Sequence, residues 1–173
     1  LVYVLGKTKE ELGGSEYFAM MGEIELGEKY IGNNVPKVNA KVAIKLYHAV
    51  GKAMDLELIE SCHDCSDGGL AVSLAESAFS GGFGMDIDLV KLPKQNINRT
   101  DFLMFSESQS RFIVTIQPKN KEKFEEIMKE NIFANIGTVI QEPIFRVKKL
   151  NSEFEEINLQ DLKIAWQQPL RFD

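Results

Sequence analysis

The chain has 173 residues, of which 44% are hydrophobic and 27% are charged, close to the composition of an ordinary globular domain. Twenty Lys and Arg against 26 Asp and Glu give a net charge of −6, and no strongly basic segment offsets this excess. Nucleic acid is therefore not expected as a partner. The sequence has no signal peptide and no apolar run of the roughly 18 to 20 residues that a membrane span needs, so we expect a cytoplasmic protein without a membrane partner.

The length fits a single hydrophobic core, and we expect residues 1–173 to form one domain. The sequence begins with Leu1 rather than Met, directly on an apolar run. We therefore expect a piece of a longer protein.

The first third of the chain combines a strand, a glycine-rich stretch and a helix. The apolar run Leu1–Leu5 predicts a buried strand. Residues 12–34 hold five glycines and predict an ordered loop, with at most a short helix over residues 15–21. Apolar residues then recur at three- and four-residue steps from Pro36, which predicts an amphipathic helix that ends near Met54.

Strands and helices alternate in the rest of the chain. Residues 83–89 and 111–117 have strand patterns, and residues 119–130 predict a surface helix with balanced charge. The remaining predicted elements are a strand over 56–62, a helix over 70–79 ended by Gly81 and Gly82, a strand pair over 135–141 and 144–150 joined at Glu142-Pro143, and a helix over 159–167. This order predicts an α/β fold with helices packed over a mixed sheet.

The segment Ser61–Leu70 crowds polar groups and glycines where a strand passes into a helix. Ser66 or Asp67 could cap the helix, while Gly68 and Gly69 would let a ligand approach its backbone. A helix start of this kind attracts phosphate, and Asp64 could hold a Mg²⁺ that bridges phosphate oxygens. The alternative is a capped helix with a tight entry turn and no ligand.

Cys62 and Cys65 have the Cys-x-x-Cys spacing of redox and metal motifs. A structural zinc site takes four ligands, but the chain has two Cys and two His, and His48 lies on the first predicted helix. Residues three apart on a strand also point to opposite faces, which would separate the sulfurs. His63 could transfer protons or be a hydrogen-bonded structural residue.

A second polar cluster, Ser106–Arg111, precedes a predicted strand. Glu107 and Arg111 could form an internal ion pair or face a ligand. The alternative is a polar strand entry with one salt bridge and no binding role.

A third cluster, Leu12–Tyr17, holds two glycines and a serine. The backbone N–H groups of Gly13, Gly14 and Ser15 could line an anion pocket. Gly-Gly-Ser is equally ordinary loop chemistry.

Together, in chain order, these three segments resemble one family. They are Leu12-Gly13-Gly14-Ser15-Glu16-Tyr17, His63-Asp64-Cys65-Ser66-Asp67-Gly68-Gly69-Leu70-Ala71 and Phe105-Ser106-Glu107-Ser108-Gln109-Ser110-Arg111. The similarity is to the C-terminal domain of the AIR synthase-related superfamily, as found in phosphoribosylformylglycinamidine synthase, and it covers nearly the whole chain. The histidine and the Ser-Asp-Gly-Gly pattern resemble the second of the two copies that this synthase carries.

The resemblance implies a three-layer helix, mixed sheet and helix fold and a glutamine-dependent ligase of purine synthesis that uses ATP and Mg²⁺. It implies that Asp64 contacts Mg²⁺ and that Ser66 contacts the phosphate of an auxiliary nucleotide, ATP or ADP, beside Gly68 and Gly69. Residues that match Glu107, Ser108 and Gln109 contact substrate in the first copy of the family. The resemblance assigns no catalytic residue to this chain, since most catalytic groups lie in other domains.

The implied partners are the N-terminal AIR synthase-related domains and a glutaminase, and the domain alone is expected to be inactive. A thiamine monophosphate kinase-like domain is the alternative within the superfamily, because it shares Asp-x-Ser-Asp-Gly but lacks Gly-Gly-Ser-Glu-Tyr. A thiol redox or zinc module built on Cys62 and Cys65 is the alternative outside it. Cys65 stands where the family has a small aliphatic residue, which favours a packing role.

Overall fold

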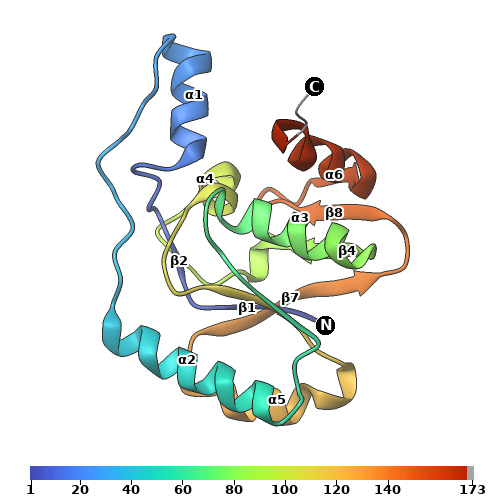
Figure 1. Cartoon of the computed structure of the whole chain (residues 1–173). Coiled ribbons are helices and arrows are strands. Elements are labelled where there is room, and N and C mark those ends of the chain that lie inside the picture. Colours follow the sequence, from blue (N-terminus) through green and yellow to red (C-terminus); the bar gives the residue numbers. More distant parts are fainter. Residues whose placement is uncertain (171–173) are drawn as a thin grey trace.

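The computed structural model describes residues 1–170, and its centre is a seven-stranded mixed sheet (Figure 1). The strand order is β3-β6-β1-β7-β4-β8-β9, and neighbours run antiparallel except β4 and β8, which are parallel. The strands of this sheet are β1 (Val2–Leu5), β3 (Ser61–Asp64), β4 (Gly84–Asp88), β6 (Phe112–Thr115), β7 (Phe133–Ile140), β8 (Ile144–Lys148) and β9 (Phe154–Asn158). A separate parallel pair joins β2 (Thr8–Lys9) to β5 (Lys94–Gln95).

Helices cover both faces of this sheet (Figure 1). The α-helices are α1 (Glu16–Leu26), α2 (Ala40–Asp55), α3 (Gly69–Gly81), α4 (Thr100–Phe105), α5 (Lys121–Met128) and α6 (Leu159–Gln167). Helices α2 and α5 lie on one face and α3, α4 and α6 on the other, whereas α1 stands away from the sheet. Within residues 1–170, none of them is both long and apolar enough to cross a membrane.

Strand β1 supplies both halves of the core because successive side chains point to opposite faces. Tyr3 and Leu5 pack with residues of α2 and α5, whereas Val2 and Val4 pack with residues of α3, α4 and α6, and all four are fully buried. The predicted three-layer arrangement is therefore confirmed.

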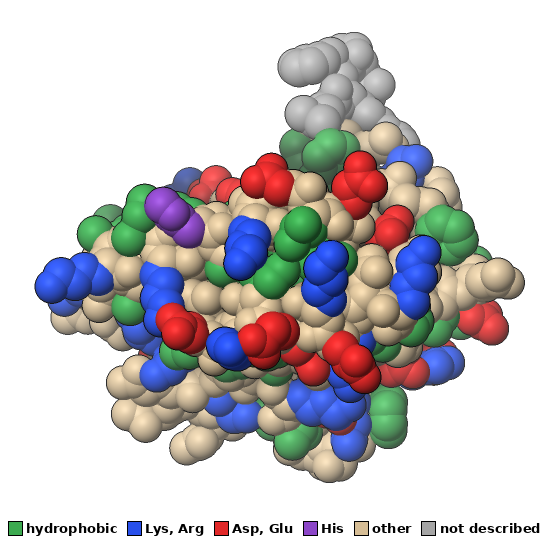
Figure 2. Space-filling model, turned by 90° about the horizontal axis from the view of Figure 1, so that it is seen from below, with side chains coloured by type: hydrophobic (Ala, Val, Ile, Leu, Met, Phe, Trp, Pro, Cys, Tyr) green, Lys and Arg blue, Asp and Glu red, His purple; other side chains and the backbone are tan. Residues whose placement is uncertain are grey.

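The α2–α5 face is closed by two amphipathic helices. Leu46 and Val50 of α2 meet Phe124 and Met128 of α5 in one apolar cluster. Figure 2 shows this side of the molecule, where cationic and anionic side chains are interspersed over the surface. The charged residues of the predicted helix 119–130 thus form an ordinary solvated surface.

The two strands predicted on either side of Glu142-Pro143 are confirmed as β7 and β8, but their direct pairing is wrong, because β4 lies between them and pairs with both. A Cβ at Gly84, the first residue of β4, would lie 2.1 Å from the backbone oxygen of Glu142, so glycine permits this insertion. Strand β9 has no alternating burial, since all five of its residues are exposed, and the sequence did not predict it.

Three boundaries also differ from the sequence prediction. The stretch over residues 12–34 contains a full helix, α1, with Gly22 inside it. A Cβ at Gly22 would lie 2.3 Å from the backbone nitrogen of Tyr30, so this glycine allows the chain after the helix to pack closely and does not mark a loop. Helix α2 begins at Ala40, capped by Asn39, rather than at Pro36. Strand β3 begins only at Ser61, since the apolar residues before it close the end of α2.

Candidate functional site

The turn between β3 and α3 is built from two glycines in the left-handed conformation. Gly68 (φ 75°) caps α3, and the backbone N–H of Gly69 (φ 60°) donates to the backbone oxygen of Ser66 at 3.0 Å. No side chain caps the helix, so the expectation that Ser66 or Asp67 does so is wrong. The conformational freedom of glycine starts this helix instead.

The side chain of Glu107 binds the backbone N–H group at the start of α3. Its Oε1 accepts a hydrogen bond from the backbone nitrogen of Gly68 at 2.9 Å. Burial raises the pKa of Glu107, and the negative charges of Asp67 and Glu16 raise it further. The hydrogen bonds from the backbone of Gly68 and Glu16 lower this pKa, but their effect is smaller than that of burial. The backbone nitrogen of Glu107 donates to the backbone oxygen of Glu11 at 3.1 Å. The three sequence motifs therefore meet at Glu107.

Both glycines of the turn are required by the packing of the chain itself. A Cβ at Gly69 would lie 2.3 Å from the backbone oxygen of Ser106, and one at Gly68 would lie 2.3 Å from Cγ2 of Val72. In this structure, the backbone of Phe105 and Ser106, just before Glu107, packs closely against Gly69. A nucleotide contact at Gly68 and Gly69 stays a prediction.

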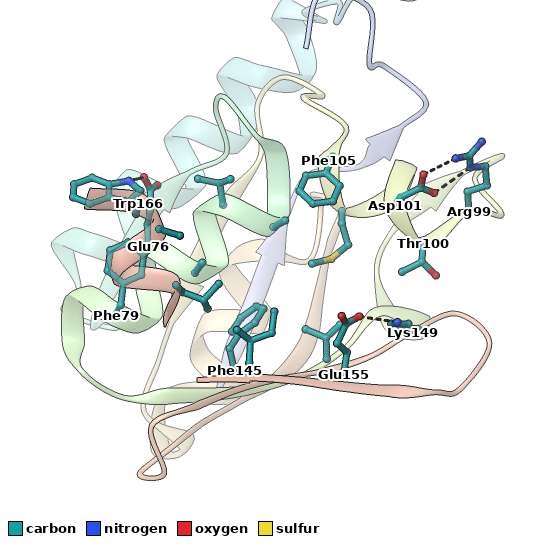
Figure 3. A pocket seen from close by; sticks show the side chains of 18 residues that line it. Glu76, Phe79, Arg99, Thr100, Asp101, Phe105, Phe145, Lys149, Glu155 and Trp166 are labelled. Carbon is teal, nitrogen blue, oxygen red and sulfur yellow. Dashed lines mark hydrogen bonds and ion pairs between the residues drawn. The ribbon is translucent and has the colours of Figure 1, made fainter. Parts of the chain in front are cut away.

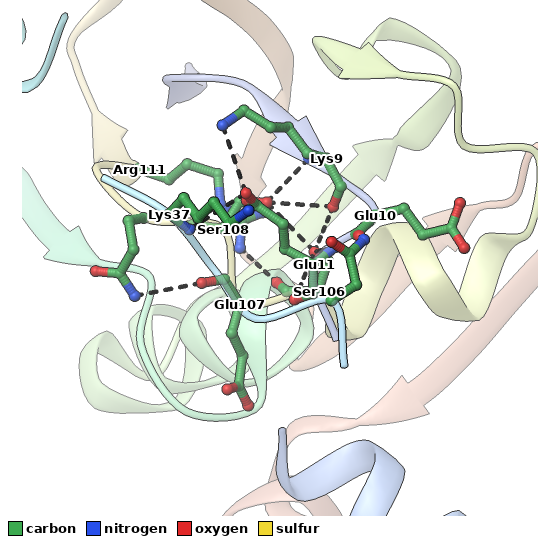
Figure 4. Close-up of polar contacts among 10 residues, drawn as sticks. Lys9, Glu10, Glu11, Lys37, Ser106, Glu107, Ser108 and Arg111 are labelled. Carbon is green, nitrogen blue, oxygen red and sulfur yellow. Dashed lines mark hydrogen bonds and ion pairs between the residues drawn. The ribbon is translucent and has the colours of Figure 1, made fainter. Parts of the chain in front are cut away.

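Arg111 is the buried centre of the second motif (Figure 4). It donates to the backbone oxygen of Ser108 and to Oγ1 of Thr8, each at 2.9 Å, and to the backbone oxygen of Ser106. Burial lowers its pKa. Arg111 forms no ion pair with Glu107 within the described residues, so its role is to hold the loop that carries Glu107.

The neighbours of Glu107 have different surroundings. Ser108 is buried, and its Oγ accepts from the backbone nitrogen of Lys9 at 2.9 Å. Gln109 is exposed, with its amide 3.4 Å from the backbone oxygen of Glu107. Ser108 thus joins the motif to β2, whereas the side chain of Gln109 is open to solvent.

The Leu12–Tyr17 motif uses its backbone N–H groups internally. Gly13 donates to the oxygen of Asn34 at 3.0 Å, Gly14 to that of Ile31 at 2.7 Å, and Ser15 to that of Leu12 at 3.0 Å. The anion pocket expected here is therefore not formed by these groups.

Ser15 and Tyr17 instead fix the start of α1. The Oγ of Ser15 caps the helix by accepting from the backbone of Phe18 at 3.2 Å. The ring of Tyr17 stacks on Phe105 at 4.7 Å, and its hydroxyl donates to Asp101 Oδ2 at 2.6 Å. Burial and this hydrogen bond raise the pKa of Tyr17 to about 12.

His63 is held by a carboxylate that the sequence did not single out. Its Nε2 lies 2.7 Å from Oε2 of Glu76 on α3, and Oε1 of Glu76 accepts from the indole of Trp166 at 2.7 Å. Of the two roles considered for His63, proton transfer and a hydrogen-bonded structural residue, this contact fits the structural one. Trp166, the only tryptophan in the sequence, is the one feature that could have drawn attention to this cluster.

The two cysteines lie on opposite faces of the sheet, as strand geometry predicts. Cys62 packs against the α2–α5 cluster, and Cys65 is buried in the α3–α4–α6 cluster. Burial raises the pKa of both thiols, which disfavours the reactive thiolate.

Asp64 is the candidate metal ligand, and its side chain is 70% exposed beside the turn. The residues described include no group of three His, Cys, Asp or Glu side chains that could hold a metal ion. Asp64 fits Mg²⁺ only as a single protein ligand, with nucleotide phosphates and water completing the coordination, which is a common arrangement for this ion.

Comparison with known proteins decides the family. The family model described as "AIR synthase related protein, C-terminal domain" matches residues 1–149. The chain belongs to this family.

Curated relatives of this AIR synthase related domain are named phosphoribosylformylglycinamidine synthase subunit PurL. The protein from Alkaliphilus metalliredigens is 37% identical over 142 residues, which cover 81% of this chain and 18% of the relative. The protein from Thermococcus sibiricus is 35% identical over 167 residues, which cover 96% of this chain and 22% of the relative. The chain therefore spans about a fifth of the length of these relatives.

Solved structures share the fold. PurL of Thermotoga maritima complexed with FGAR aligns with a TM-score of 0.77 at 24% identity, over 93% of this chain and 27% of that protein. HypE of E. coli aligns with a TM-score of 0.63 at 15% identity, over 92% of this chain and 49% of that protein. These similarities confirm the α/β fold class and the AIR synthase-related architecture.

Proposed function

We propose that this domain is part of phosphoribosylformylglycinamidine synthase, the ligase that converts formylglycinamide ribonucleotide to formylglycinamidine ribonucleotide with ATP and glutamine in purine biosynthesis. The PurL relatives and the order of the three motifs support this proposal. The remaining four fifths of the relatives' length would supply the N-terminal AIR synthase-related domains, with a glutaminase as a further partner. The site of action is the cytoplasm.

In this proposal, the turn before α3 binds the phosphates of a Mg²⁺-nucleotide. Asp64 holds the metal, and Ser66, Gly68 and Gly69 contact phosphate. T. maritima PurL has been solved in complex with ADP, ATP and AMPPCP. Mg²⁺ would neutralise phosphate charge beside the exposed carboxylate of Asp64.

The observation that carries the proposal is the hydrogen bond from Gly68 to Glu107. A carboxylate oxygen already takes the position at the start of a 13-residue helix that a phosphate oxygen would take. Glu107 thus acts as an internal stand-in for the ligand, and phosphate binding requires its carboxylate to move aside.

We expect weak affinity in the isolated domain, because base and ribose would be held by partner domains. A dissociation constant on the order of 0.1 to 1 mM is consistent with phosphate contacts alone. The domain should also be inactive by itself. Phosphate release from ATP that depends on formylglycinamide ribonucleotide and ammonia, in the purified chain, would contradict this.

The binding test is a titration with ADP, with and without Mg²⁺, of the wild type and of Asp64→Asn. The variant removes the metal-binding charge and keeps the shape, so ADP affinity should fall several-fold with Mg²⁺ and should not fall without it. Asp55→Asn, at the end of α2, is the matched control and should bind as the wild type does. Binding that is absent at millimolar ADP, or equal in all three proteins, would reject the nucleotide site.

A further inference from the structure

A cavity of about 740 Å³ opens between α3, α4, α6 and strands β8 and β9 (Figure 3). Its walls are mainly apolar, with aromatic side chains from four of these elements: Phe79, Phe105, Phe145 and Trp166. The turn Asp64–Gly69 contributes no lining residue. This volume and lining are typical of small-molecule sites, which span roughly 300 to 1,000 Å³.

The cavity has two chemically different ends. Figure 3 shows the rings of Phe79 and Trp166 at one end, with Glu76 beside them. At the other end lie Arg99, Thr100 and Lys149, with the carboxylates of Asp101 and Glu155. A bound molecule would therefore place an apolar body and a polar group at opposite ends.

The acidic side chains that line the cavity are already paired. Glu76 uses both oxygens, one on His63 and one on Trp166. Asp101 accepts from the Tyr17 hydroxyl and from Arg99. These carboxylates have no strong need for a ligand cation.

The basic side chains keep free donors. Arg99 uses Nε and Nη2 on Asp101, and its Nη1 has no hydrogen-bond partner within residues 1–170. Lys149 contacts one carboxylate, Glu155, at 2.7 Å, although an ammonium group has three donors. The formal charges at this end balance, with Arg99 and Lys149 against Asp101 and Glu155, so this end offers a ligand the unused N–H donors of the two cations.

We propose that this cavity binds a small organic anion, with a flat apolar body against the contacting rings of Phe79 and Trp166 and a carboxylate, sulfonate or phosphate group at Arg99 and Lys149. The inference rests on this cavity alone and does not depend on the nucleotide site.

The test uses two dyes that differ in charge. Anilinonaphthalene sulfonate has the proposed chemistry, and N-phenyl-1-naphthylamine is its uncharged analogue. Because Trp166 is the only tryptophan and lines the cavity, energy transfer from Trp166 reports a bound dye, and the variants below show whether the dye lies in the cavity. We expect saturable transfer to the sulfonate dye.

Charge and shape are then changed separately. Lys149→Gln should lower the affinity for the sulfonate dye about three- to tenfold and leave the affinity for the uncharged dye unchanged. Lys148→Gln is the control, because Lys148 does not line the cavity, and it should change neither affinity. Ala75→Phe fills the cavity from α3 and should weaken both dyes, whereas Ile44→Phe on exposed α2 should not.

Several results would overturn the proposal. One is the absence of saturable energy transfer, and another is a folded Ala75→Phe variant that binds both dyes as the wild type does. If Lys149→Gln affects both dyes equally or neither, the anion is rejected, and the cavity is an apolar surface of the kind that a partner domain covers. The comparison of lysine variants decides this even if Ala75→Phe does not fold.

Discussion

The two faces of the sheet are held together in different ways. On the α2–α5 face, two amphipathic helices bury apolar side chains against β1 and β6, and none of the three sequence motifs contributes a helix to it. On the α3 face, the motifs meet around Glu107 and the buried Arg111, which bind backbone groups of loops. Apolar area therefore stabilises both faces, and on the α3 face specific polar contacts also position the turn and its loops.

This difference predicts how each face responds to substitution. Apolar packing distributes stability over many side chains, so that a volume change is partly accommodated. A substitution that removes a hydrogen bond to a buried backbone group leaves that group without a partner, and this lowers the free energy of unfolding by the full desolvation penalty of the group. Single changes near Glu107 should thus cost more than changes of similar size on α2.

The largest effect is expected from Gly69→Ala. The new methyl group would lie 2.3 Å from the backbone oxygen of Ser106, at φ 60°. Strain and overpacking together should lower the free energy of unfolding by about 3 to 5 kcal/mol. Gly51→Ala in α2 has open space around the methyl group and should gain about 0.5 to 1 kcal/mol. Urea denaturation of both variants measures this contrast, and equal stabilities would break it.

Arg111→Met should have the next largest effect. It removes the donors to the backbone oxygens of Ser106 and Ser108, which then lack partners in a buried place, and should cost about 2 to 4 kcal/mol. Arg146→Met breaks two partly exposed ion pairs on the sheet and should cost about 1 kcal/mol or less. Thermal and urea unfolding should rank the two variants in this order, and the reverse order would contradict the role of Arg111.

Tyr17→Phe should have a smaller effect, about 1 kcal/mol, because it removes the hydrogen bond to Asp101 and keeps the stacking on Phe105. The pKa of Tyr17 is raised to about 12 from 10, so the folded state favours the neutral phenol. Its contribution is complete below pH 10 and is lost as the pH rises towards 12. The variant should lose less stability than the wild type over this interval, and identical pH profiles would refute the assignment.

Much of the fold follows from local pattern, and the remainder depends on contacts distant in sequence. Periodicity predicts α2, α3 and α5, and apolar runs predict β1 and β6. Helix α4 has six residues, too few for a periodic signal, and exposed β9 has no alternation. The sequence pattern of β4, β7 or β8 does not specify which strand pairs with which, so the position of β4 between β7 and β8 could not be predicted from it.

The candidate site shows the same limit. The glycines and Asp64 predict where a ligand could approach, but Gly68 and Glu107 are 39 residues apart. Only the folded chain shows that a carboxylate occupies the helix start. The sequence likewise offers no sign that Glu76 joins His63 to Trp166.

The most direct test of the account follows the Gly68 amide by NMR. In the free domain its shift should titrate with the ionisation of Glu107, with a midpoint above 4.5 because burial raises that pKa. Millimolar Mg²⁺-ADP should move this amide and abolish its titration, since phosphate replaces the carboxylate; in Glu107→Gln, the free domain should show no titration from this group. An amide that stays in place with Mg²⁺-ADP and keeps its titration would contradict the account, and the turn would then be a helix start packed only against its own chain.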